Sequence, residues 1–160
     1  MTEANGFEPR IVAFLCRWCA GAGADLAGTS RIKYPPNAIP IRVSCSGRIE
    51  PGWVAQALRS GADGVFIGGC HPGDCHYVSG NFKARRRIYL LRKVLAELGV
   101  EPERVRLEWV SATEATRFAH LMAAFVAEIQ ALGPGPYARQ APAADLGLTL
   151  AVGAGEPDRS

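Results

Sequence analysis

The chain has 160 residues, of which 48% are hydrophobic and 21% charged, and its formal net charge is +3. This is the size and composition of one soluble globular domain with its own core. The mild positive charge does not predict nucleic-acid binding, and no apolar run approaches the roughly 20 residues of a membrane helix. The polar start lacks the basic and apolar segments of a signal peptide. We therefore expect a cytoplasmic protein whose five cysteines stay reduced.

Apolar runs of strand length alternate with helical patterns along the chain. The predicted strands cover 11–16, 39–45, 63–70 and 105–110, and the last alternates apolar and polar residues as a strand near a sheet edge does. The predicted helices are a short one from residue 25, one over 51–61, a long one from a cap at Asn81 to 98, and a last one opened by a Ser111–Glu114 capping box. This alternation predicts the α/β class. We expect a single doubly wound parallel sheet of about four strands, in the flavodoxin-like order 2-1-3-4, with helices on both faces.

Composition sets the expected boundaries of the domain. Residues 1–9 are predicted to be a flexible N-terminal lead, and residues 10–133 the α/β domain. Residues 134–160 are rich in Pro, Gly and Ala. We expect them to form a tail that is either flexible or docked on a partner.

Three of the five cysteines each close an apolar strand: Cys16, Cys45 and Cys70. Because all carboxyl ends of a parallel sheet lie at one edge, these thiols should gather there although they are far apart in sequence. Cys19 and Cys75 follow Cys16 and Cys70 closely. Ligands in such sheets bind outside the carboxyl ends of the strands. The sequence therefore predicts a binding site made of five thiols.

A site of four thiolates suits zinc or an iron–sulfur cluster. Ligands distributed over several loops of a preformed scaffold favour the cluster, with four of the five cysteines as ligands. Cys75 is the least certain ligand because it is the more mobile member of its loop. His71 and His76 are interpreted as loop residues or as hydrogen-bond donors to the ligands.

Two other functions stay open. Cys16 and Cys19 follow a strand at the spacing of a thioredoxin-like dithiol oxidoreductase. A zinc-binding scaffold protein would use the same thiols without redox chemistry.

Basic residues cluster at the start of the long predicted helix, over 83–87. The helix dipole disfavours positive charge at this end. The cluster is either a docking surface for an acidic partner or a plain solvated face.

Four segments carry a family resemblance: FLCRWCAGAGADLAG, YPPNAIPIRVSCSGRI, GADGVFIGGCHPGDCHYVSGN and RLEWVSATEATRF. They resemble the delta subunit of methyl-viologen-reducing hydrogenases. The members of this family are hydrogenase iron–sulfur subunits associated with heterodisulfide reductase. The resemblance covers residues 10–133 and includes all five cysteines. It implies an electron-transfer subunit that carries a 2Fe-2S cluster and passes electrons to the flavin-containing subunit of heterodisulfide reductase. Because the sequence shows no evident catalytic base, nucleophile or substrate pocket, we expect the isolated chain to be non-catalytic. The implied electron donor is a nickel–iron hydrogenase, a formate dehydrogenase or another oxidoreductase.

Overall fold

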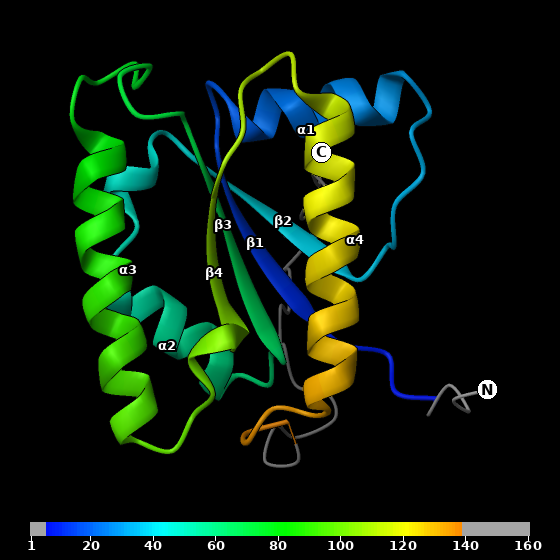
Figure 1. The fold of residues 1–160 in the computed structure, drawn as a ribbon, viewed down its shortest axis with the longest axis vertical. Helices are drawn as coiled ribbons and strands as arrows, with labels where there is room; N and C mark the ends of the chain where they lie inside the picture. The colour runs from blue at the N-terminus through cyan, green and yellow to red at the C-terminus, as the bar shows by residue number, and fades with distance from the viewer. Residues whose placement is uncertain (1–5, 139–160) are drawn as a thin grey trace, which may run out of the picture.

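A parallel sheet forms the centre of the molecule (Figure 1). The structure is a computed structural model and describes residues 6–138. The strands of the sheet are β1 (Ile11–Cys16), β2 (Ala38–Val43), β3 (Gly64–Gly69) and β4 (Val105–Trp109). They lie in the order β2-β1-β3-β4, and every pairing is parallel. The predicted α/β class and strand order are therefore confirmed.

Helices cover both faces of this sheet. They are α1 (Ala20–Thr29), α2 (Pro51–Arg59), α3 (Gly80–Glu97) and α4 (Ala115–Leu132), with short 3-10 turns at Ser46–Arg48 and Pro102–Arg104. The helices α1 and α4 lie on one face, and α2 and α3 on the other (Figure 1). Within the described part of the chain, no helix combines the length and the apolar composition needed to cross a membrane.

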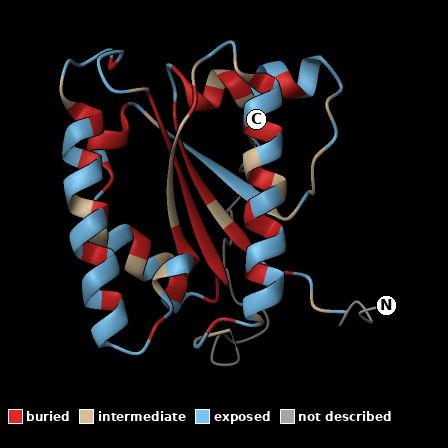
Figure 2. Cartoon of the chain, in the orientation of Figure 1, coloured by how far each residue is buried: buried red, intermediate tan, exposed pale blue. Residues whose placement is uncertain are grey.

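Two hydrophobic clusters lie on opposite faces of the sheet because strand side chains alternate. Phe66 of β3 packs against Phe118 and Phe125 of α4 on one face. Its neighbours Val65 and Ile67 belong to the cluster on the other face, with α2 and α3. All six residues of β3 are buried, as expected for a central strand covered on both sides (Figure 2).

The helix α1 begins at Ala20, five residues before the predicted start. Its small residues let it lie close to neighbouring backbone. A Cβ at Gly21 would lie 3.0 Å from the Cys16 carbonyl oxygen, and one at Gly23 would lie 2.9 Å from the Ser111 carbonyl oxygen. The prediction was wrong because tertiary packing overrides the low helix propensity of glycine.

The predicted caps of α3 and α4 are also displaced. Ser79 precedes α3, and Asn81 is its second residue, buried and turned toward the preceding loop rather than capping the helix. At α4, the Glu114 carboxylate accepts a 2.8 Å hydrogen bond from the Ser111 backbone N–H, but the helix begins only at Ala115. One of the two hydrogen bonds of the predicted capping box is therefore formed, but it lies in the turn that precedes the helix.

A buried arginine joins elements at the amino end of the sheet. Arg104 is 1% exposed, and its guanidinium donates to the carbonyl oxygens of Asp63 and Gly133, both at 3.0 Å, and of Pro134 at 3.3 Å. The end of α4 is thereby tied to the start of β3 by charged hydrogen bonds, which are stronger than neutral ones.

The chain after α4 continues along this end of the sheet. The Asp63 carboxylate accepts hydrogen bonds from the backbone N–H groups of Arg10, at 2.8 Å, and Gly135, at 2.7 Å. Most of the tail predicted to be flexible or partner-docking, residues 139–160, lies outside the described residues, as do residues 1–5 of the predicted lead.

We expect Arg104→Leu to lower the free energy of unfolding by about 2–4 kcal/mol, because buried carbonyl groups lose their donor. Urea unfolding measures this loss. The control Arg59→Leu removes an exposed arginine of α2 and should change stability by less than about 0.5 kcal/mol. Equal midpoints for the two variants would contradict the structural role of Arg104.

Candidate metal centre

The carboxyl ends of three neighbouring strands carry the thiols. Cys16 is the last residue of β1, Cys70 directly follows β3, and Cys45 lies two residues beyond β2. Cys19 lies just before α1, and Cys75 lies in the loop before α3. The structure thus brings all five cysteines to one rim of the sheet. All five are free and between 1% and 9% exposed.

The five sulfur atoms form two neighbouring groups. The Sγ atoms of Cys16, Cys19 and Cys70 lie within 4.8 Å of one another, and those of Cys16 and Cys70 are 3.8 Å apart. The Sγ atoms of Cys45 and Cys75 are also 3.8 Å apart. The rim therefore holds a group of three thiols beside a pair.

Two glycines make room for the pair. A Cβ at Gly80 would overlap the Sγ of Cys45 and lie 3.2 Å from that of Cys75. A Cβ at Gly47 would lie 2.6 Å from the Cα of Gly80. The 3-10 turn after β2 and the start of α3 can approach each other around these sulfur atoms only because both positions lack side chains.

Two polar groups lie in the turn that carries Cys45. The Gly47 backbone N–H donates to the Sγ of Cys45 at 3.4 Å. The Ser46 hydroxyl is buried and has no hydrogen-bond partner among the described residues. A buried hydroxyl without a partner is costly, so a further acceptor at this rim would satisfy it.

Aromatic side chains from two loops contact each other beside the rim. The rings of Trp18 and His76 stack with their centroids 3.9 Å apart, and Trp18 Nε1 donates to the Tyr77 hydroxyl at 3.4 Å. This contact joins the loop after β1 to the loop after β3. His76 therefore acts as a packing residue of the loop.

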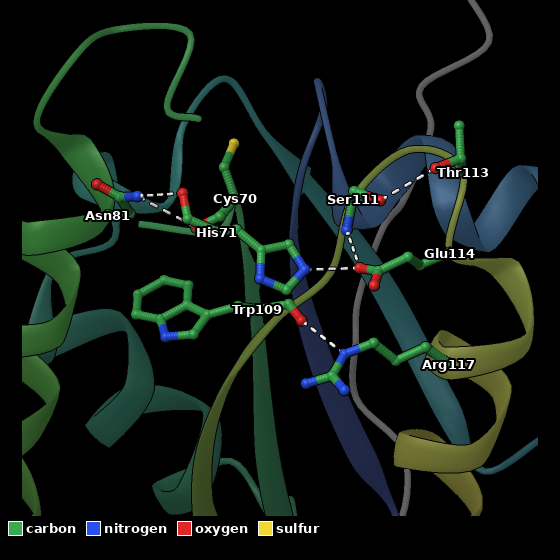
Figure 3. A network of polar contacts seen from close by, with 8 residues as sticks. All are labelled: Cys70, His71, Asn81, Trp109, Ser111, Thr113, Glu114 and Arg117. Atoms are coloured by element: carbon green, nitrogen blue, oxygen red, sulfur yellow. Dashed lines mark hydrogen bonds and ion pairs between the residues drawn. The ribbon is translucent and has the colours of Figure 1, made fainter. Parts of the chain in front are cut away.

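A polar network holds the loop after β3 (Figure 3). His71 Nε2 and Glu114 Oε2 are 2.6 Å apart, and the buried Asn81 amide donates to the carbonyl oxygens of Cys70, at 3.2 Å, and His71, at 2.8 Å. The Ser111 N–H and then His71 lower the pKa of Glu114 to about 2. Sequence reasoning missed these roles of Asn81 and Glu114, although the capping-box spacing had singled out Glu114.

Hydrogen bonding separates the pKa values of neighbouring thiols in the group of three. The Cys19 thiol stabilises the Cys16 thiolate and lowers the pKa of Cys16 to about 5. The same hydrogen bond raises the pKa of Cys19. Burial raises the pKa of Cys70 to about 11.

The Cys45–Cys75 pair is divided in the same way. Burial raises the pKa of Cys45. Burial acts in the same direction on Cys75, but the backbone N–H groups of Asn81, Tyr77 and Gly80 outweigh it and lower the pKa of this thiol. Each group thus contains one thiol with a lowered pKa, Cys16 in the group of three and Cys75 in the pair. Binding of a metal would release the protons of the other thiols that become ligands.

Buried thiols gathered at the carboxyl rim of a parallel α/β sheet are ligands of the kind that select zinc, copper(I) or iron–sulfur clusters. Residues 11–133 match the family model described as the delta subunit of methyl-viologen-reducing hydrogenase. The chain belongs to this family.

Named relatives agree with this assignment. The chain is 55% identical over 133 residues to the iron-sulfur subunit of the F420-non-reducing hydrogenase of Archaeoglobus profundus, a match that covers 83% of this chain and 97% of that protein. It is 49% identical over 126 residues to one subunit of the ferredoxin/F(420)H(2)-dependent CoB-CoM heterodisulfide reductase of Methanosarcina acetivorans. This second match covers 79% of this chain but only 16% of that protein, so an equivalent domain is there part of a much longer chain.

We expect Gly80→Ala to disrupt the thiol site, because the added methyl group would overlap the Sγ of Cys45. Iron content and the melting temperature should both fall. The matched control is Gly28→Ala in α1, where a Cβ would meet no atom within 4 Å. The control should keep its iron and be as stable as the native chain or more so, by up to about 1 kcal/mol.

We expect Asn81→Asp to loosen the loop after β3, because a carboxylate would face the Cys70 and His71 carbonyl oxygens in place of an amide donor. The predicted loss of stability is about 1–3 kcal/mol. Hydrogen–deuterium exchange should accelerate at the amides of 70–77 and stay unchanged at the strand β1. Unchanged protection of this loop would count against the role of Asn81.

Proposed function

We propose that the chain is an electron-transfer subunit that binds a 2Fe-2S cluster in its thiol site. It relays electrons between a hydrogenase or another oxidoreductase and the flavin-containing subunit of a heterodisulfide reductase. The observation that carries the proposal is the presence of two thiol pairs, each 3.8 Å apart, at one buried rim.

The pair distances favour a two-iron site. A tetrahedral metal with sulfur bonds of about 2.3 Å has neighbouring ligands about 3.8 Å apart. We assign Cys16 and Cys70 to one iron and Cys45 and Cys75 to the other, which leaves Cys19 as the fifth thiol. This proposal differs from the sequence-based expectation, in which Cys75 was the least certain ligand.

The bound cluster would supply one-electron redox chemistry, and residues of the chain would tune its potential through hydrogen bonding and burial. The Gly47 N–H, which donates to the Sγ of Cys45, is one such donor. Cys75, at 9%, is the most exposed of the five cysteines. Electrons would therefore pass most directly on the side of Cys75.

Relatives support the choice of partners. Several are named as iron-sulfur subunits of hydrogenases, and two are named as subunits of heterodisulfide reductases. Fusion of an equivalent domain to a heterodisulfide reductase chain would hold it permanently beside that partner. We propose that the present chain reaches an equivalent position as a separate subunit, with a hydrogenase, a formate dehydrogenase or another oxidoreductase as donor. Five free thiols suit a reducing cytoplasm.

A dithiol oxidoreductase is the second candidate, because the pKa of Cys16 is lowered to about 5. Burial argues against it. Cys16 and Cys19 are only 1% and 5% exposed, so a disulfide substrate would not reach either sulfur atom. A zinc scaffold would use the group of three and one further ligand, and would not require the second 3.8 Å thiol pair, Cys45–Cys75.

Anaerobically purified protein should contain about two irons and two acid-labile sulfides per chain, as a 2Fe-2S cluster requires. Reduction should produce a paramagnetic signal in electron paramagnetic resonance. Zinc without iron would indicate the scaffold, and a metal-free chain with a reversible Cys16–Cys19 disulfide would indicate the oxidoreductase.

A series of five single Cys→Ser variants identifies the ligands. Serine at positions 16, 45, 70 or 75 should abolish the cluster or alter its spectrum, while Cys19→Ser should retain both iron and the native spectrum. Loss of the cluster in Cys19→Ser together with its retention in Cys75→Ser would restore the sequence-based expectation.

A further inference from the structure

The helix α3 carries more than the whole net positive charge of the protein. It has six basic residues and one acidic residue, so a chain of net charge +3 has a net charge of −2 outside this helix. Four of the basic residues lie in its first half, where the helix dipole disfavours them. Helix stability therefore does not explain their presence.

Only one of these six side chains has an acidic partner within residues 6–138. Arg87 lies 3.4 Å from the Glu50 carboxylate and donates to the Gly47 carbonyl oxygen at 2.8 Å. The other five form no ion pair with described residues. They are exposed: Lys83, Arg85, Arg86, Arg92 and Lys93.

Three of them line a groove between α3 and β4, about 590 Å³ in volume. Arg85, Arg92 and Lys93 provide its charge, and Tyr89 and Trp109 are its aromatic residues. No acidic residue lines the groove. The strand β4 is the last in the sheet order, so its outer backbone edge has no paired strand within the described residues.

The groove is connected to the thiol site through Trp109. A Cβ at Gly69 would lie only 2.8 Å from Cζ3 of the indole, so the ring packs against the residue that precedes Cys70. Figure 3 shows the indole on the side of the sheet that faces α3. A protein bound in the groove would therefore lie beside the backbone of a proposed cluster ligand.

We propose that the α3–β4 groove is a docking site for an acidic segment of the flavin-containing partner subunit. Carboxylates of this segment pair with Arg85, Arg92 and Lys93, and an apolar side chain packs against Tyr89 and Trp109. Lys93 Nζ already lies 4.9 Å from the centre of the Tyr89 ring, which orders part of the surface before binding. This inference rests on the proposed function and adds to it the surface that recognises the partner.

Charge complementarity selects an acidic protein segment over a nucleic acid. Outside α3, residues 6–138 contain ten basic and ten acidic residues, so the net positive charge of the described residues is that of this one helix rather than of a broad basic face. An acidic segment needs only the groove itself.

The test compares two variants that change the net charge equally. The variant Arg85→Glu/Arg92→Glu reverses the charge of two residues that line the groove. The control Arg10→Glu/Lys33→Glu reverses the charge of two exposed residues that do not line it. The probe is the purified flavin-containing heterodisulfide reductase subunit, and its Kd is measured by biolayer interferometry at low and high salt. We expect the groove variant to bind about 10-fold or more weakly at low salt, with a reduced salt dependence, and the control to change Kd less than about 3-fold.

Iron content and the reduced spectrum are recorded for each variant, and both should match those of the native chain. Equal binding by the groove variant and the native chain would overturn the inference, as would equal weakening in both variants. Tighter binding of polyuridylate than of the flavin subunit would also overturn it, in favour of nucleic acid. An absent cluster in the native chain, by contrast, would contradict the proposed function itself.

Discussion

Parallel pairing of β1 with both β2 and β3 is the constraint on which the thiol site depends. Because these neighbouring strands point the same way, Cys16, Cys45 and Cys70 emerge at one rim although they are separated by 54 residues of chain from first to last. An antiparallel neighbour would place its cysteine at the opposite edge. Cys19 and Cys75 need only short loops to join the same rim.

Close approach of backbone segments turns this rim into an enclosed site. Glycines at 47 and 80 let the turn after β2 meet the start of α3 around Cys45 and Cys75. Hydrogen bonds from the Asn81 amide then hold the backbone of the loop after β3. The same helix that closes the site carries the basic surface of the α3–β4 groove, so the proposed cluster and its proposed docking surface share one rigid element.

Much of the fold and the location of the site could be predicted from local pattern. Buried strands read as continuous apolar runs, and the β-α alternation with right-handed crossovers led to the observed strand order. Local signals failed where side chains serve distant partners. Asn81 was predicted to be a helix cap but is bound to the loop after β3, and Gly21 and Gly23 precede the predicted helix but lie within α1.

The sequence by itself determined that five thiols meet at one edge of a parallel sheet, because strand direction and the position of each cysteine relative to its strand are local properties. Only the tertiary structure decided how those thiols are grouped, with Cys45 beside Cys75 and Cys16 beside Cys70. It also decided that Trp109 joins the basic groove to this edge. Such distances depend on how loops and helices pack across the sheet, and no pattern along the chain encodes that packing.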